Sequence, residues 1–165
     1  MADSVTDLAD LYQRDLTRLL QQIQAFPTDE SLWQVVPGIS NPAGTLVLHL
    51  EGGLRHFIGH RLGGISYQRK RAEEFTTKGA SKAELVSRIE ELRRLVPPVI
   101  RALSEQAMSE LYPEVILERP LTTQGWLVSL FGHVSWHLGQ IDYLRRTLTG
   151  GGAIEAAGLE TDNNR

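Results

Sequence analysis

The sequence predicts an all-α fold, a four-helix bundle with long connections. Long helices are expected at residues 4–26, 42–63, 81–106 and 124–148, and no clear strand or internal repeat is found. Polar segments rich in proline and glycine separate these helices. Helices of this kind bury their apolar faces by packing against one another, which favours a bundle.

The first two predicted helices each have a recognisable signal. In residues 4–26, leucines and other apolar residues recur at steps of three and four, the period of an amphipathic helix. The helix at 42–63 follows Asn41 and Pro42, an N-cap residue and then a proline at the first position, where no backbone donor is lost.

Three glycines inside the second predicted helix are unusual. Gly52, Gly53 and Gly59 each cost about 1 kcal/mol relative to alanine in a helix interior. We therefore expect a neighbouring helix or a ligand to pack very close to this helix.

The middle of the chain is less regular. Residues 64–80 have mixed charges, and we interpret them as a solvated connection. The helix at 81–106 contains Pro97–Pro98, where we expect a kink or a break. The segment EVILE, residues 114–118, is short enough to be either a strand or extended chain.

The last helix and the tail complete one predicted domain. Thr122 or Thr123 is expected to cap the helix at 124–148. We expect residues 1–150 to form a single helical-bundle domain and residues 151–165, small and polar, to be a disordered tail.

Composition excludes several classes of partner and site. The net charge of −3, from 17 basic and 20 acidic residues, gives no reason to expect nucleic acid. No segment is long and apolar enough to suggest a membrane span, and the acidic N-terminal sequence does not resemble a signal peptide, so we expect a cytoplasmic protein. Because the chain has no cysteine, a metal ion could be held only by imidazole, carboxylate, carbonyl or water.

The histidines are the most informative residues. His133 and His137 are four residues apart, so their rings are neighbours on one helix face and can meet at one ion. A third ligand would come from His49, His56 or His60 of the second helix, and the apolar surroundings of His49 favour it. The spacing alone leaves open that these are hydrogen-bonded core histidines.

Two segments resemble a known family. "NPAGTLVLHL" with a histidine on the second helix, and "HVSWHLGQIDYLRR" on the last, resemble the DinB-like (YfiT-like, damage-inducible) superfamily over about residues 5–148. The resemblance implies a four-helix bundle, a homodimer, and a divalent metal ion, such as Zn, Ni, Fe or Mn, held by His49, His133 and His137. Characterised relatives activate a low-molecular-weight thiol for transfer reactions, and others look like metal-dependent hydrolases.

These observations lead to two functional hypotheses. The first is a metal-dependent enzyme, a thiol-dependent transferase or a hydrolase, that acts on a small molecule. In it, Gln140 would be a hydrogen-bond partner of His137 or a pocket residue, and His56 an acid or base at the pocket mouth. Gln140 could equally be an amide between helices, and His56 a structural residue paired with a loop carboxylate. The alternative hypothesis is a non-catalytic, dimerising helical module with structural histidines.

Overall fold

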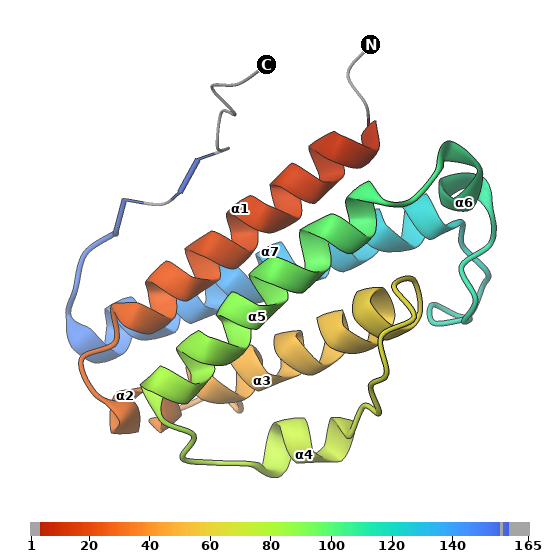
Figure 1. Ribbon diagram of the computed structural model, residues 1–165. Coiled ribbons are helices and arrows are strands. Elements are labelled where there is room, and N and C mark those ends of the chain that lie inside the picture. The colour runs from red at the N-terminus through yellow and green to blue at the C-terminus, as the bar shows by residue number, and fades with distance from the viewer. Residues whose placement is uncertain (1–3, 156, 159–165) are drawn as a thin grey trace.

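The fold is all-α, as predicted. The computed structural model describes residues 4–155, 157 and 158, and within these residues the regular elements are helices (Figure 1). Seven are α-helices and one is a π-helix: α1 (Ser4–Gln24), α2 (Asp29–Trp33), α3 (Ala43–Leu54), η1 (Arg55–His60), α4 (Arg71–Thr76), α5 (Lys82–Arg101), α6 (Glu105–Ser109) and α7 (Thr123–Thr149).

The four long helices pack around one hydrophobic core. Helix α1 contacts α5 and α7, and α3 also contacts α5 and α7, so each long helix has two long neighbours. Figure 1 shows that α3 and α7 run in opposite directions, as do α1 and α5. The buried apolar side chains form one continuous cluster that draws on every long helix. No helix in the described part of the chain has the length and apolar character required to cross a membrane.

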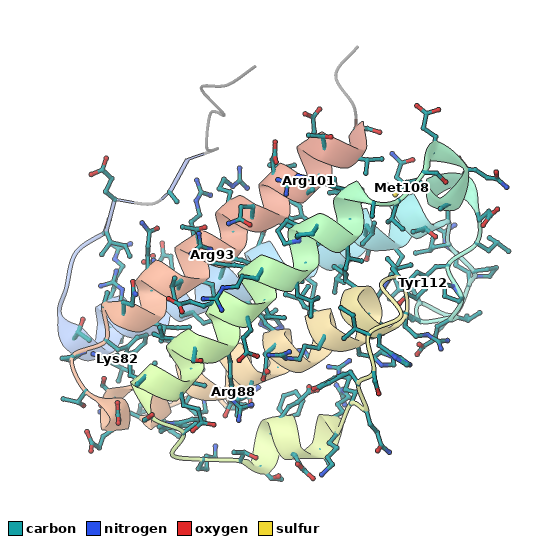
Figure 2. The ribbon with its side chains drawn as sticks, in the orientation of Figure 1. Lys82, Arg88, Arg93, Arg101, Met108 and Tyr112 are labelled. Carbon is teal, nitrogen blue, oxygen red and sulfur yellow. The ribbon has the colours of Figure 1, made fainter. Side chains whose placement is uncertain are left out.

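Polar contacts fix α5 against α1 at both ends. The Lys82 ammonium donates to the Phe26 carbonyl at 2.9 Å, and Arg101 at the other end pairs with Asp10 (Figure 2). The break expected at Pro97–Pro98 does not occur, because α5 continues as one helix to Arg101.

The second predicted helix is not a single α-helix. After Leu54 the chain continues as the π-helix η1, with bonds that span five residues from Gly63 to Ile58 (2.9 Å) and from Arg61 to His56 (3.0 Å). Side-chain periodicity does not distinguish this geometry from an α-helix, so the sequence did not predict it.

One connection differs from expectation, and in another the structure excludes one of the two forms that the sequence left open. Residues 64–80, predicted as a solvated connection, contain the short helix α4. Residues 114–118 form no strand; the one β-bridge among the described residues joins Leu111 to Thr122. Thr122 is the N-cap of α7, and its hydroxyl accepts from the Gly125 N–H at 3.1 Å.

Beyond α7, the described part of the chain lies against the bundle. Arg145 donates to the Gly152 carbonyl at 2.9 Å, and the Ala157 carbonyl accepts from Arg18 at 2.7 Å. That residues 151–165 form a disordered tail stays a prediction. Residues 156 and 159–165 of this segment lie outside the described residues.

Candidate metal centre

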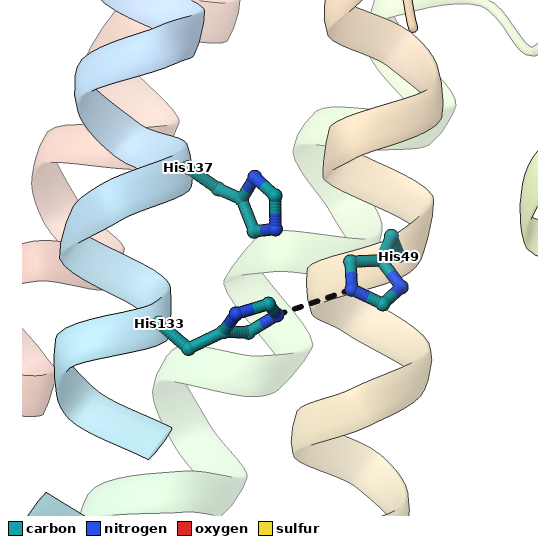
Figure 3. Close-up of side chains that lie close together, drawn as sticks. All are labelled: His49, His133 and His137. Carbon is teal, nitrogen blue, oxygen red and sulfur yellow. Dashed lines mark hydrogen bonds between the residues drawn. The ribbon is translucent and has the colours of Figure 1, made fainter. Parts of the chain in front are cut away.

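Three histidines from two antiparallel helices come together. His49 extends from α3, and His133 and His137 extend from successive turns of α7 toward it (Figure 3). One ligating nitrogen from each ring lies within 4.8 Å of the others, and Nε2 of His49 is 3.1 Å from Nε2 of His133. Two nitrogens on a tetrahedral zinc ion with bonds of about 2.0–2.1 Å would be roughly 3.3 Å apart. The three histidines are therefore positioned to bind a metal ion.

The buried face of α7 determines where its two histidines point. Leu130, Val134 and Ile141 are almost fully buried in the core and fix the rotation of the helix. His133 and His137 lie at the edge of that buried stripe, on the side that faces α3. Helix packing, rather than a loop, thus holds these rings in place.

Glu74 of α4 orients His49. Nδ1 of His49 donates to Oε2 of Glu74 at 2.9 Å, since the carboxylate can only accept. Arg69 donates to both oxygens of the same carboxylate, at 2.6 and 2.9 Å. Burial alone would raise the pKa of Glu74, but the hydrogen bonds from His49 and Arg69 outweigh it and hold the pKa below that of an ordinary glutamate. Glu74 therefore stays ionised.

Gln140 accepts a hydrogen bond from His137, as Glu74 does from His49. Its side-chain oxygen lies 2.6 Å from Nδ1 of His137, so the imidazole donates through Nδ1. Nδ1 is thus the donor on both His49 and His137, and Nε2 is the nitrogen left to bind a metal ion. Structures of metal sites show this same arrangement, in which an outer acceptor fixes the tautomer of a ligating histidine.

The site favours neutral imidazoles. Burial, together with the nearby His137, His49 and Arg69, lowers the pKa of His133 to about 4. Burial also lowers the pKa of His137, against the effect of its hydrogen bond to Gln140. Both rings are therefore neutral at pH 7, which is the form that binds metal ions.

Gly52 explains how Glu74 comes so close to α3. A Cβ atom at residue 52 would lie 2.2 Å from Oε1 of Glu74, whereas a Cβ at Gly53 would lie 3.7 Å from Arg69, an ordinary contact. At Gly59 the nearest atom belongs to Leu95 of α5, at 3.1 Å. The close neighbour predicted for these glycines is thus present at Gly52 and Gly59, and the prediction is wrong for Gly53.

Two pockets border the triad from opposite ends of α7. Side chains of α7 between Trp126 and Val134 line one pocket of about 260 Å³ together with His49, and side chains between His137 and Thr147 line another of about 510 Å³. His133 belongs to the first pocket, and His137 and Gln140 belong to the second. A ligand can therefore approach the triad from either side.

The other two histidines lie elsewhere. His56 is on η1, donates from Nε2 to Glu114 at 3.1 Å, and does not line either of these two pockets. This contact fits the structural alternative, and a catalytic role for His56 remains a prediction without support from its position. His60 donates to the Ile65 carbonyl at 3.0 Å.

Arg69 and Glu74 are not among the site residues that the sequence predicts. The interpretation of their segment as solvated is wrong for Glu74, since only 7% of it is exposed. The signal that could have indicated it was the helical glycine at residue 52, which implied a close neighbour without identifying it.

Comparison with known proteins agrees with this fold. Residues 4–155 match the family described as "Protein of unknown function (DUF1572)". Among solved structures, a DinB-like protein from Bacillus cereus ATCC 10987 is similar, with a TM-score of 0.66 and 16% identity over 87% of this chain and 93% of that one. No curated protein matched. The resemblance to the DinB-like fold that the sequence indicated is confirmed.

Proposed function

Because the chain belongs to the DUF1572 family, whose function is unknown, its function must be inferred from the site, and we propose that it is a metal-dependent enzyme. In this proposal His49, His133 and His137 hold one divalent ion, such as Zn, Ni, Fe or Mn. The reaction is a transfer or hydrolysis on a small molecule, and a low-molecular-weight thiol is the candidate cosubstrate.

One observation carries the proposal. Glu74 and Gln140 each accept a hydrogen bond from Nδ1 of a triad histidine, so the other ring nitrogen, Nε2, faces the remaining histidines as the candidate ligand. Histidines that were merely packed in a core would not need their ligating nitrogens within 4.8 Å of one another. This arrangement supports a site built for a cation.

The chemistry follows from the number of ligands and from the pockets. Three protein ligands leave coordination positions open, as in catalytic rather than structural sites. A bound divalent ion would supply a Lewis acid that lowers the pKa of a water or thiol. The chain's own contribution is to orient the ligands through Glu74 and Gln140 and to line the approach with apolar side chains such as Phe57 and Leu130.

Metal content tests the proposal directly. The protein is purified without a metal-affinity column and analysed for metals as wild type, His133→Ala and the matched control His60→Ala. We expect about one equivalent of metal in the wild type and in His60→Ala, and little in His133→Ala. Absence of binding to all three proteins after addition of Zn, Ni, Fe and Mn, or equal binding by His133→Ala, would refute the assignment.

Activity separates the enzyme from a structural metal protein. The metal-loaded wild type is assayed for thiol transfer to a chromogenic electrophile and for hydrolysis of small esters and amides. We expect one of these reactions to depend on the metal and to be lost in His133→Ala. A protein that binds metal but catalyses none of them would support the alternative, a non-catalytic module with structural histidines.

The exposed face of α7 supports a homodimer as a further part of the proposal. Val128, Trp136 and Tyr143 are 55%, 69% and 70% exposed and recur at steps of eight and seven residues, so they lie on one face. Gly132 and Gly139 lie between them and would let a second helix approach closely. We expect Trp136→Glu to convert a dimer to a monomer in sedimentation experiments; a monomeric wild type would contradict this part.

A cytoplasmic location also remains a proposal, which cell fractionation would test.

A further inference from the structure

We propose that the 260 Å³ pocket beside His49 and His133 binds an amphipathic carboxylate, with its apolar body inside the pocket and its carboxylate on Arg71. This inference names the substrate class of the proposed enzyme and rests on the proposed function for its role, but the binding itself requires no metal. The pocket is referred to below as the α3–α7 pocket; its lining includes Leu54, Phe57 and Leu130.

Most residues that line the α3–α7 pocket are apolar, and the charged ones are positive. Leucine, isoleucine, valine and aromatic side chains from α3, η1, α7 and residues 116–117 form most of the lining. The charged and titratable residues described in this lining are Arg69, Arg71, His49 and His133, and none of the described lining residues is acidic. An apolar molecule with one negative group matches this surface.

The two arginines differ in what they already bind. Arg69 makes two hydrogen bonds to Glu74 and lies 5.2 Å from the Phe57 ring centre, so its guanidinium is committed to the protein. Arg71 has no ion pair with any described residue, and its guanidinium lies 5.3 Å from the Phe75 ring centre. Stacking holds the guanidinium in place while its N–H groups stay free for a carboxylate, which they can bind through two parallel hydrogen bonds.

Helix α4 connects this arginine to the triad. Phe75 contacts both Arg71 and the His49 ring, with 5.1 Å between the centres of the Phe75 and His49 rings. Residues 71, 74 and 75 are three and four positions apart, so one face of α4 presents Arg71, Glu74 and Phe75 together. The same short helix thus orients a triad histidine and supplies the free cation of the neighbouring pocket.

The volume of the pocket limits the size of the ligand. At about 30 Å³ per water in the liquid, 260 Å³ corresponds to roughly nine waters. By proportion to a cavity of about 150 Å³ that binds benzene, a ligand of about ten non-hydrogen atoms matches this volume. The expected class is therefore a medium-chain or arylalkyl monocarboxylate.

A matched pair of ligands tests the charge. Metal-free protein is titrated with 3-phenylpropionate and with its uncharged isostere, 3-phenylpropanamide, by isothermal titration calorimetry. We expect the carboxylate to bind about tenfold more tightly than the amide, the low end for a hydrogen bond to a charged group. Equal affinities, no binding of either ligand, or tighter binding of phenyl phosphate than of the carboxylate would overturn the proposal.

Substitutions of single arginines test which residue binds the carboxylate. Arg71→Ala should lose the preference for the carboxylate and keep the affinity for the amide, because the apolar walls are unchanged. Arg94→Ala, which removes an arginine from α5 whose side chain is 74% exposed, should behave as the wild type. A carboxylate preference retained by Arg71→Ala, or lost equally by both variants, would overturn the proposal.

The indole signal of Trp126 locates the ligand. Trp126 lines the α3–α7 pocket, and Trp126→Phe identifies its indole N–H resonance in a nitrogen–proton correlation spectrum. We expect this resonance to shift on addition of 3-phenylpropionate; shifts confined to the indoles of Trp33 and Trp136 would place the ligand elsewhere and refute the assignment.

Metal analysis of the same protein keeps the two proposals separate. Carboxylate binding that depends on Arg71 in a protein that binds no metal would refute the proposed function and support this pocket. A metal-binding protein that does not distinguish the carboxylate from the amide would refute this pocket and leave the metal site intact.

Discussion

Replacing Gly52 with alanine tests how closely the triad depends on α4. The new Cβ atom would lie 2.2 Å from Oε1 and 2.8 Å from Cδ of Glu74. Ordinary contact begins near 3.4 Å, so the carboxylate must retreat by about 1.2 Å. Because it is the end of a flexible side chain, it can move, and the energetic effect comes from the bonds that it leaves.

Those bonds join Glu74 to two partners. The carboxylate is 2.9 Å from Nδ1 of His49, and 2.6 and 2.9 Å from the two nitrogens of Arg69. A movement of about 1.2 Å breaks at least one of them, and a hydrogen bond to a charged group contributes about 1.5–3 kcal/mol. Against this, alanine gains about 1 kcal/mol over glycine in a helix.

The neighbouring glycine supplies the control. Gly53→Ala gains the same helix propensity but places its Cβ 3.7 Å from Arg69, where nothing must move. We expect Gly52→Ala to be less stable than Gly53→Ala by about 1.5–3 kcal/mol in urea unfolding of the metal-free proteins. We also expect its zinc affinity, measured with a competing chelator, to fall about 10–100-fold, the range for loss of a partner that orients a ligand.

Equal stability and equal zinc affinity of Gly52→Ala and Gly53→Ala would refute the reasoning. That result would mean that the Glu74 carboxylate has another position of the same energy and that His49 does not need it.

Three further predictions follow from single contacts. Glu74→Gln should keep the fold but weaken zinc binding about tenfold or more, because an amide is a poorer acceptor for His49; a competition titration that shows wild-type affinity would contradict this. Tyr12→Phe should lower the free energy of unfolding by about 1 kcal/mol, because the buried hydroxyl donates to the Leu127 carbonyl at 2.8 Å; an unchanged urea midpoint would argue against that contribution. In metal-free protein, the folded pKa of His133 is about 4, against an ordinary 6.5, so the unfolded chain takes up its proton first as the pH falls. The free energy of unfolding should therefore decrease as the pH falls from about 6.5 to 4, and it should decrease less steeply in His133→Asn than in the wild type. Denaturant unfolding that gives parallel pH profiles for the two proteins would contradict this.

The large elements could be predicted because their signals are local. The cap at Thr122 and the glycine at residue 150, which has a φ of +67°, mark the two ends of α7 in the sequence itself. The spacing of His133 and His137 on that helix fixes their relation to each other, whatever the fold around them. The apolar surroundings of His49 favoured it as their partner, and the resemblance was needed to decide between a metal site and core histidines, because the contact crosses from α7 to α3.

The supporting residues could not be predicted because their signals are not local. Helix α4 is six residues long, which is too short for a hydrophobic period, and its segment is dominated by charged residues. The burial of Glu74 depends on the space that Gly52 leaves in a different helix and on the charge of Arg69. These conditions exist only after the chain has folded.

X-ray absorption spectroscopy of the zinc-loaded protein tests the central claim most directly. The account predicts three imidazole nitrogens at about 2.0–2.1 Å with at least one further oxygen ligand, and a loss of one imidazole or of the bound zinc in His137→Ala. A zinc ion with fewer than three imidazoles in the wild type, or an unchanged spectrum in His137→Ala, would contradict it.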